Sequence, residues 1–437
     1  MITMEEMKAH TSSKITKSGW ATIGFLFFLA IINVADKSII GLASVPIMKE
    51  LGLTPAQWGL VGSAFFWFFS LSAVLVGALS DYVGTKKVIA VISSIWAVVQ
   101  FATVFVASFP FLLVTRIILG AGEGPTYGLS MAMASKCLPK DKIGTGLTLV
   151  SVGNTVGAAV AAPVLLFFIT SYSWHVAFIF MGAIGVVWTL LWIFFAKDRP
   201  SEAEAEVAAP KPEKAISVPW SEFLPLLLSK NFLLISLCAF ASYWFFSLEL
   251  SWFPNYFEKV RGMDGNMLKI AIMLPWITTT ISQLFFSNIS DRLYQKTRNV
   301  VKSRVLIVGP MVVIAAISYY LTTIVSSNTA AVALLCLATA FRSIILVLGP
   351  AILTDTFAPK HYGKAQGSFT AIYYLAGIIA PFVTGLIVQN AASPAEGFHT
   401  AFHVGSVIMI VLGLLFWFGV RPKKNSSSLF TNVNNDI

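Results

Sequence analysis

Charged side chains are scarce in this sequence of 437 residues: Asp, Glu, Lys and Arg make up 11% of it, against about 25% in an ordinary soluble domain. Apolar residues make up 57% and aromatic residues 13%. A soluble chain of this size does not need so much apolar surface, and a disordered chain is rich in charge. The composition therefore excludes a soluble enzyme, a soluble DNA-binding protein and a disordered chain.

Cysteine and histidine are also few. The three Cys residues are odd in number and lie in or beside apolar runs, so they indicate no disulfide framework. The five His residues show no ligand spacing, and the sequence predicts no metal site and no cofactor. It also lacks the Gly-x4-Gly-Lys-Ser/Thr loop that cradles nucleotide phosphates, which argues against ATP as the energy source.

Long apolar runs are what the sequence has instead. A helix needs about 20 residues to cross the hydrocarbon core of a bilayer. The first run is too long for a signal peptide and contains charge, so it is not expected to be cleaved. We predict an all-α membrane protein with twelve transmembrane helices, at about 20–45, 57–79, 88–107, 109–135, 144–169, 175–196, 232–256, 268–289, 303–325, 329–356, 365–388 and 400–420.

The cations fix the expected orientation. Of the 30 Lys and Arg residues, 23 fall in the tails and loops of one side and four on the other. Lys and Arg are retained on the cytoplasmic side of a membrane, so both termini are predicted to be cytoplasmic. The net charge of +10 is therefore explained by the bilayer, without a nucleic-acid partner. The expected location is the inner or plasma membrane, with the chain crossing it many times as a monomer.

The sequence divides in the middle. We expect a cytoplasmic tail at 1–19, a six-helix bundle at 20–196, a polar cytoplasmic linker at 197–231, a second bundle at 232–420 and a disordered tail at 421–437. A surface helix is expected in the linker near Trp220–Leu228.

The two bundles repeat one another. Ser173-Trp-His175-Val-Ala177-Phe178 precedes the sixth run, and Gly397-Phe-His399-Thr-Ala401-Phe402 precedes the twelfth. Two six-helix halves in the same orientation are the parallel-repeat plan of one transporter class, in which substrate binds between the halves near the midplane. The binding cavity is accordingly expected between 20–196 and 232–420.

The loop after the second run carries a family resemblance. It resembles the signature loop of the major facilitator superfamily, with glycines, one acid and two cations in Gly77-Ala-Leu-Ser-Asp81-Tyr-Val-Gly84-Thr-Lys86-Lys87. The resemblance implies the fold of that superfamily over about 20–420. It also implies a cytoplasmic gate made by Gly77, Asp81, Gly84, Lys86 and Lys87, which breaks in each cycle.

Within that superfamily the chain resembles the anion:cation symporters, which include bacterial sugar-acid and organic-acid transporters. The resemblance rests on Asp36-Lys37 in span one, on Arg116-x3-Gly120-x2-Glu123-Gly-Pro125 in span four and on Trp252-Phe-Pro254-Asn-Tyr256 at the end of span seven. It implies that Asp36 and Glu123 carry the driving proton and that Lys37 and Arg116 belong to the substrate and charge network. It also places a substrate-binding amide at Asn154.

The buried charges themselves point the same way. A charge in the bilayer costs about 2.5–3.5 kcal/mol on insertion scales and is usually paired or functional. Arg116 and Glu123 are seven apart and share one helix face. Loss of water disfavours the charged form of Glu123, which could then bind and release a proton. The alternative is a static ion-pair network that only fixes helix packing.

Several positions stay open. Asn154 suits an interhelical hydrogen bond as well as it suits a substrate. Glu249 is either a site residue or an acid that reaches water at the outer end of span seven, Arg342 is undecided, and Asp355 is expected to be structural.

The chain departs from the symporter pattern in a consistent direction. Lys37 stands where these symporters have Arg, Phe69 where they have Tyr, and Tyr374 where they have Asn, so Tyr374 is also assigned to the substrate network. The changes remove polar recognition and add aromatic surface, so an acid with few hydroxyls, including an aromatic one, fits better than a sugar acid. An amphiphilic drug also fits.

Three functions are weighed on these grounds. The first is proton-coupled import of an organic anion. The second is proton-coupled efflux of amphiphilic drugs, whose Gly-x3-Gly-Pro-x2-Gly mark is absent after Gly153-x3-Gly157. The third, a transporter-like sensor, would carry a large soluble domain, and an enzyme is not expected.

Overall fold

The computed structural model describes residues 17–138, 142–196 and 220–422. Most of the two expected tails and most of the expected linker therefore lie outside the described residues. The expected surface helix of the linker is present as α11 (Trp220–Leu227), and its Phe223 is fully buried.

The described residues form helices and no strands. Eleven helical segments are long and apolar enough to cross a membrane. This agrees with the physics of the bilayer, where a helix satisfies every backbone polar group within itself. The remaining expected span, the fourth at 109–135, is not one helix: α7 ends at Glu123 and α8 begins at Thr126. The break falls at Gly124 and Pro125, where proline removes a backbone donor.

The chain divides into two compact units, which do not simply follow the two halves of the sequence. The first unit is Met1–Ile47 with Trp67–Pro212, and the second is Met48–Phe66 with Glu213–Ile437. The expected second span is thus divided between the units, because a turn at 65–68 separates the helix Pro55–Ala64 from the helix Phe69–Val83.

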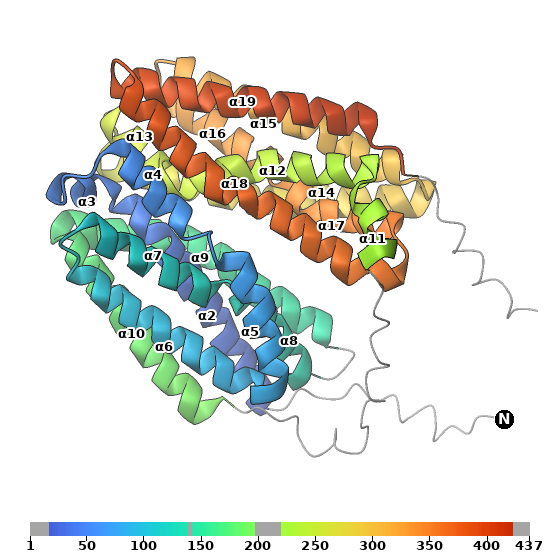
Figure 1. Ribbon diagram of the computed structural model, residues 1–437, viewed down its shortest axis with the longest axis horizontal. Coiled ribbons are helices and arrows are strands. Elements are labelled where there is room, and N and C mark those ends of the chain that lie inside the picture. Colours follow the sequence, from blue (N-terminus) through green and yellow to red (C-terminus); the bar gives the residue numbers. More distant parts are fainter. Residues whose placement is uncertain (1–16, 139–141, 197–219, 423–437) are drawn as a thin grey trace, which may run out of the picture. The chain divides into compact units, whose positions relative to one another are not determined.

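The first unit holds most of the helices from the first half of the chain. They are α2 (Lys17–Leu42), the start of α3 (Ser44–Glu50), α5 (Phe69–Val83), α6 (Thr85–Val104), α7 (Phe109–Glu123), α8 (Thr126–Cys137), α9 (Ile143–Ser171) and α10 (Trp174–Phe195). In Figure 1 they are coloured from blue to green.

Helix α2 packs along α9 in this unit. Glycines on α9 allow the close approach: a Cβ on Gly153 would lie 2.5 Å from the carbonyl oxygen of Phe27, and one on Gly157 would lie 2.8 Å from Cα of Ile31. On the other side, α6 packs against α10 and α7. The result is that α2, α6 and α7 bring their polar residues into one interior.

The second unit holds the remaining helices. They are α4 (Pro55–Ala64), α11, α12 (Lys230–Ser251), α13 (Phe253–Lys259), α14 (Gly265–Thr297), the π-helical turn η2 (Val301–Val305), α15 (Leu306–Ile324), α16 (Asn328–Arg342), α17 (Ile344–Thr356), η3 (Pro359–His361), α18 (Tyr362–Asn390) and α19 (Pro394–Gly419). Helix α12 packs against α18 and α19, and α15 packs against α16 and α19 (Figure 1).

Helix α4 packs on α18 within this unit. A Cβ on Gly59 would lie 2.5 Å from the carbonyl oxygen of Pro381. Trp58 donates its indole N–H to the carbonyl of Ser251 at 3.1 Å. Ser63 donates its hydroxyl to the carbonyl of Ile378 at 2.5 Å. Glycine contact and backbone hydrogen bonds therefore join this short helix to the second unit.

The helix lengths repeat between the two halves of the sequence. Helices α7 and α16 each have 15 residues and are followed by a break and a second short helix. Helices α3 and α13 each have seven residues and follow the first long helix of a half.

Candidate functional site

The amide of Asn33 on α2 links the first span to Glu123, the acid of the fourth span. Asn33 and Lys37 lie four apart on α2 and so share a face. Lys37 donates from Nζ to Oδ1 of Asn33 at 2.6 Å, and Asn33 donates from Nδ2 to Oε2 of Glu123 at 3.0 Å. Nζ of Lys37 lies 3.6 Å from the same carboxylate oxygen. Glu123 is 1% exposed, so its charge is balanced by α2 and not by water.

Asp36 faces a different helix, as the neighbour of Lys37 must. Gln100 on α6 donates from Nε2 to Oδ1 of Asp36 at 2.5 Å. Both side chains are buried. Arg116, which is 3% exposed, interacts electrostatically with both Asp36 and Glu123. We call Asn33, Asp36, Lys37, Gln100, Arg116 and Glu123 the first charge cluster.

The first charge cluster can hold a proton and an anion by ordinary chemistry. It contains two buried carboxylates and two cations. The carboxylate oxygen Oε1 of Glu123 is buried and accepts no hydrogen bond from a described residue, so a proton could reside there. Nζ of Lys37 is the more exposed cation and lies 5.4 Å from the ring centre of Phe69.

A glycine behind Glu123 makes this geometry possible. A Cβ on Gly124 would clash with the carbonyl oxygen of Phe69 and the hydroxyl of Ser72. We expect Gly124→Ala to destabilise the protein by about 1–3 kcal/mol, because a packed backbone must move. The measurement is the melting temperature of the purified protein in detergent.

Gly128→Ala is the matched control for that change. Gly128 lies one helical turn further along the same span, and a Cβ there would meet nothing within 4 Å. Alanine is more favourable than glycine in a helix interior by up to about 1 kcal/mol. The melting temperature of this variant should therefore equal or exceed that of the wild type. Equal melting temperatures for the two alanine variants would contradict the close contact at Gly124.

Two residues predicted for the substrate network are not part of this cluster. Asn154 lies half-buried on α9 in the first unit, and its amide makes no hydrogen bond within the described part of the chain. Tyr374 lies on α18 in the second unit, in an aromatic group with Tyr243, Tyr373 and Phe66. Its ring centre is 5.0 Å from that of Tyr243 and 4.7 Å from that of Tyr373.

Four of the predicted gate residues lie at or beside the α5–α6 turn, and Gly77 lies further back within α5. Gly84 has a φ of +100°, a backbone conformation that residues with a side chain rarely adopt, and this explains why the position is glycine. Lys86 donates from Nζ to the carbonyl of Ile193 at 3.0 Å, while Asp81 and Lys87 are exposed. Gly77 has open space beside it, and Asp81 forms no ion pair with a described residue.

In the second unit Asp291, in the Ser290-Asp291 pair that corresponds to Ser80-Asp81, does belong to an ion-pair network. Arg304 lies 2.8 Å from Asp355 on α17 and 4.0 Å from Asp291 on α14. The ring of Tyr294 lies 5.0 Å from the guanidinium carbon of Arg304. Asp355 is therefore the partner of a buried cation.

A second buried cluster was not assigned from the sequence. Arg342, the last residue of α16, donates from Nη2 to Oε2 of Glu249 at 2.5 Å and from Nε to Oε1 at 3.0 Å. Tyr319 on α15 donates its hydroxyl to Oε1 of Glu249 at 2.5 Å and accepts from Nε of Arg342 at 3.0 Å. We call Glu249, Tyr319 and Arg342 the second charge cluster.

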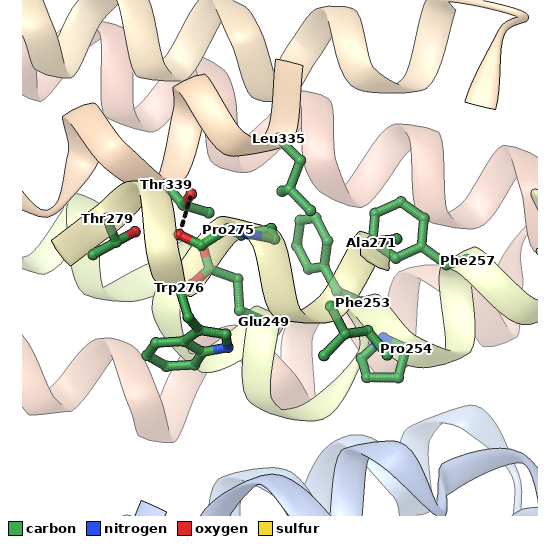
Figure 2. A pocket seen from close by; sticks show the side chains of 11 residues that line it. Glu249, Phe253, Pro254, Phe257, Ala271, Pro275, Trp276, Thr279, Leu335 and Thr339 are labelled. Carbon is green, nitrogen blue, oxygen red and sulfur yellow. Dashed lines mark hydrogen bonds between the residues drawn. The ribbon is translucent and has the colours of Figure 1, made fainter. Parts of the chain in front are cut away.

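Glu249 also borders a cavity of about 20 Å³, which has room for one water molecule. Figure 2 shows its carboxylate beside Trp276 and Pro275, with Phe253 and Phe257 on the opposite wall. Glu249 is the one ionisable residue among the described residues that line this cavity. Over the described ranges, no three His, Cys, Asp or Glu side chains gather as a metal site requires.

Comparison with known proteins identifies the family. The family model described as Major Facilitator Superfamily matches residues 26–338 and 302–433. A hexuronate transporter of Bacillus subtilis is 28% identical over 412 residues, which is 93% of this chain and 96% of that protein. A probable sulfoacetate transporter of Cupriavidus necator is 29% identical over 387 residues, which is 85% of this chain and 87% of that protein.

A solved structure shares the fold. A bacterial homologue of the human lysosomal transporter Spinster has a TM-score of 0.77 at 17% identity, covering 94% of this chain and 98% of that one. The family match along nearly the whole chain, the membrane-spanning helices and this shared fold lead to one conclusion: the chain belongs to the Major Facilitator Superfamily and is a multi-pass membrane transporter, not an enzyme.

Proposed function

We propose that this transporter imports a small organic anion together with protons, by alternating access. The observation that carries the proposal is the first charge cluster, where two buried carboxylates lie with two cations. Buried charge of both signs in one membrane helix bundle is costly and is typical of proton and ion pathways. The relatives reported above are named for hexuronate and sulfoacetate, which are organic anions, and neither is named for a drug.

The chemistry follows from the hydrogen bonds of Glu123. When Glu123 is ionised, Lys37 and Asn33 both satisfy its oxygen Oε2. When it takes up a proton, Lys37 keeps its hydrogen bond to Asn33 but loses its ionised partner, and it can attract the carboxylate of a substrate. Proton binding thus favours anion binding, which is the linkage a symporter needs. Asp36 with Gln100 is the second acid of this scheme.

The pattern of residues narrows the substrate class. Tyr374 offers an aromatic face in place of an amide and lies in a group of aromatic rings. An acid with few hydroxyl groups, including an aromatic carboxylate, suits such surroundings better than a polyhydroxylated one. Sulfoacetate, for which one relative is named, has no hydroxyl group at all.

The test is uptake into proteoliposomes of the purified chain, with an acidic exterior and a neutral interior. The panel is radiolabelled glucuronate, galactonate, sulfoacetate and benzoate, with one amphiphilic drug. We expect accumulation of at least one acid above its level in protein-free liposomes, which benzoic acid can enter in its neutral form. This excess should disappear when a protonophore collapses the gradient. Proton release driven by the drug, with silence toward every acid, would replace import by efflux.

Glu396→Gln is the matched control in that assay. Glu396 is an exposed acid in the first turn of α19, where its backbone N–H is capped by Ser393, and glutamine suits that position as well. Its uptake should equal that of the wild type. The transporter is proposed to act as a monomer in the inner or plasma membrane, with both termini cytoplasmic. It is driven by the proton gradient and needs no cofactor.

A further inference from the structure

The second charge cluster repeats the first with the signs exchanged. In the first unit a cation near the end of α2 pairs with an acid, Glu123, which is the fifteenth and last residue of α7. In the second unit an acid near the end of α12 pairs with a cation, Arg342, which is the fifteenth and last residue of α16. Both pairs therefore join the first long helix of a half to the break in its fourth span.

Arg342 cannot be left without a negative partner. Its side chain is 2% exposed, and it is held from several sides. Its guanidinium carbon lies 5.3 Å from the ring centre of Phe246, and its backbone carbonyl accepts a hydrogen bond from Ser242. Moving Glu249 away would leave a buried, uncompensated charge. Any event that neutralises Glu249 must therefore bring another anion to Arg342.

Arg342 also has binding capacity to spare. Its nitrogen Nη1 is buried and donates to no acceptor in the described part of the chain. A guanidinium presents its donors as a planar fork that matches a carboxylate. Glu249 accepts hydrogen bonds from Nη2 and Nε, so Nη1 is available to an incoming carboxylate before Glu249 dissociates from Arg342.

Glu249 is placed to receive a proton. It borders the water-sized cavity of Figure 2. The groups that face it are Tyr319 from α15 and Arg342 from α16. The described residues of α13 and α14 that line the cavity add apolar side chains and one threonine, and no further charge.

We propose that Arg342 is a carboxylate-binding site of the second unit, where Glu249 is a resident counter-ion that the substrate's carboxylate replaces. One O–H bond forms at Glu249, and one O–H bond breaks in the hydronium ion that delivers the proton and becomes water. One proton and one carboxylate thus enter together, and the charge around Arg342 stays constant. This inference rests on the proposed function, and it adds a second coupled proton to the one at the first charge cluster.

The experiment uses the purified full chain and acetate, the smallest stable carboxylate probe. Melting temperatures are measured in sodium acetate and in sodium chloride of equal ionic strength, for wild type, Glu249→Gln and Glu249→Gln/Arg342→Gln. Glutamine imitates the protonated acid, so Arg342 lacks a counter-ion. Acetate should raise the melting temperature of Glu249→Gln by roughly three times the wild-type gain or more. The double variant should lose this gain.

The opposite results overturn the proposal. A Glu249→Gln protein that gains no more from acetate than the wild type has no anion site at Arg342. A double variant that keeps the gain places the site elsewhere. If Glu249→Gln does not fold, Tyr319→Phe takes its place: it removes one hydrogen bond to Glu249 and keeps the ring that stacks on Phe245 at 3.7 Å. Acetate should protect it more than wild type, whereas a purely structural role predicts equal losses in both salts.

A second measurement separates this inference from the proposed function. Glucuronate is added to weakly buffered protein, and proton uptake is followed. Glu249→Gln should take up about one proton fewer than wild type while glucuronate still raises its melting temperature. Equal proton uptake by both proteins overturns the role of Glu249. If glucuronate does not bind even to the wild type, the proposed substrate is wrong, and the acetate experiment still decides the site at Arg342.

Discussion

Replacing Glu123 by glutamine is expected to lower the accumulation of the anion against its gradient by about 100-fold, which is the share of the proton that Glu123 carries. One coupled proton in a gradient of about two pH units supports roughly 100-fold accumulation, because each pH unit is worth about 1.4 kcal/mol. Glutamine cannot take up that proton. It keeps the size of the side chain and an oxygen that accepts from Asn33, so the fold around it should survive. The measurement is the steady-state ratio of labelled acid inside and outside proteoliposomes.

Exchange is the internal control for this prediction. Swapping labelled for unlabelled acid across the membrane needs no net proton movement, so Glu123→Gln should retain it. Loss of both exchange and accumulation would point to misfolding or to a role in anion binding. Full accumulation by the variant would show that Glu123 is a static partner of Lys37 and does not carry the proton.

Arg342→Met is expected to lower stability by about 3–5 kcal/mol. The change removes a cation and leaves Glu249 as a carboxylate whose side chain is 10% exposed, with Tyr319 as its remaining partner. Removing one member of a buried ion pair costs this much, whereas removing both can be neutral. Glu249→Met/Arg342→Met should therefore recover most of the loss. The measurement is the melting temperature of all three variants and the wild type, read as a double-mutant cycle.

The double variant separates the cost of an unpaired charge from the cost of losing the shape of the Arg342 side chain. If the single variant is as stable as wild type, the ion pair does not contribute to the fold. If the double variant is no better than the single one, the loss comes from the shape of Arg342 and its contact with Phe246, not from unpaired charge.

The course of the helices was predictable because the bilayer leaves few alternatives. Apolar runs of about 20 residues become helices wherever they cross, and the expected span at 400–420 is part of one long helix, α19. Hydropathy carries no information about breaks inside a run, so the division of span four between Glu123 and Thr126 was missed. Pro125 was the available signal, since its ring cannot continue the preceding hydrogen-bond ladder.

The candidate site was predictable to the extent that spacing along one helix determines it. Charge in an apolar run indicated Asp36, Lys37, Arg116 and Glu123, and the structure brings these four into one interior. The amides of Asn33 and Gln100 were missed, although single amides in apolar runs are a signal of their own. The pairing of Glu249 with Arg342 joins residues 93 apart. Periodicity gives the face of each helix but not which helix lies opposite, so one sequence could not supply that pair.

The place where span two divides has a consequence for cutting the chain. Helix α4 is synthesised with the first half, but its contacts, including the backbone contact of Gly59 with Pro381, lie in the second unit. A fragment that starts after the linker would lack α4 and leave uncovered the surface of α18 on which α4 packs. A fragment that ends before the linker would carry α4 without its contacts. Neither half of the chain is therefore a complete folding unit: the second half lacks α4, and the first half carries α4 without its partners. We expect the second unit to form only when both halves of the chain are present.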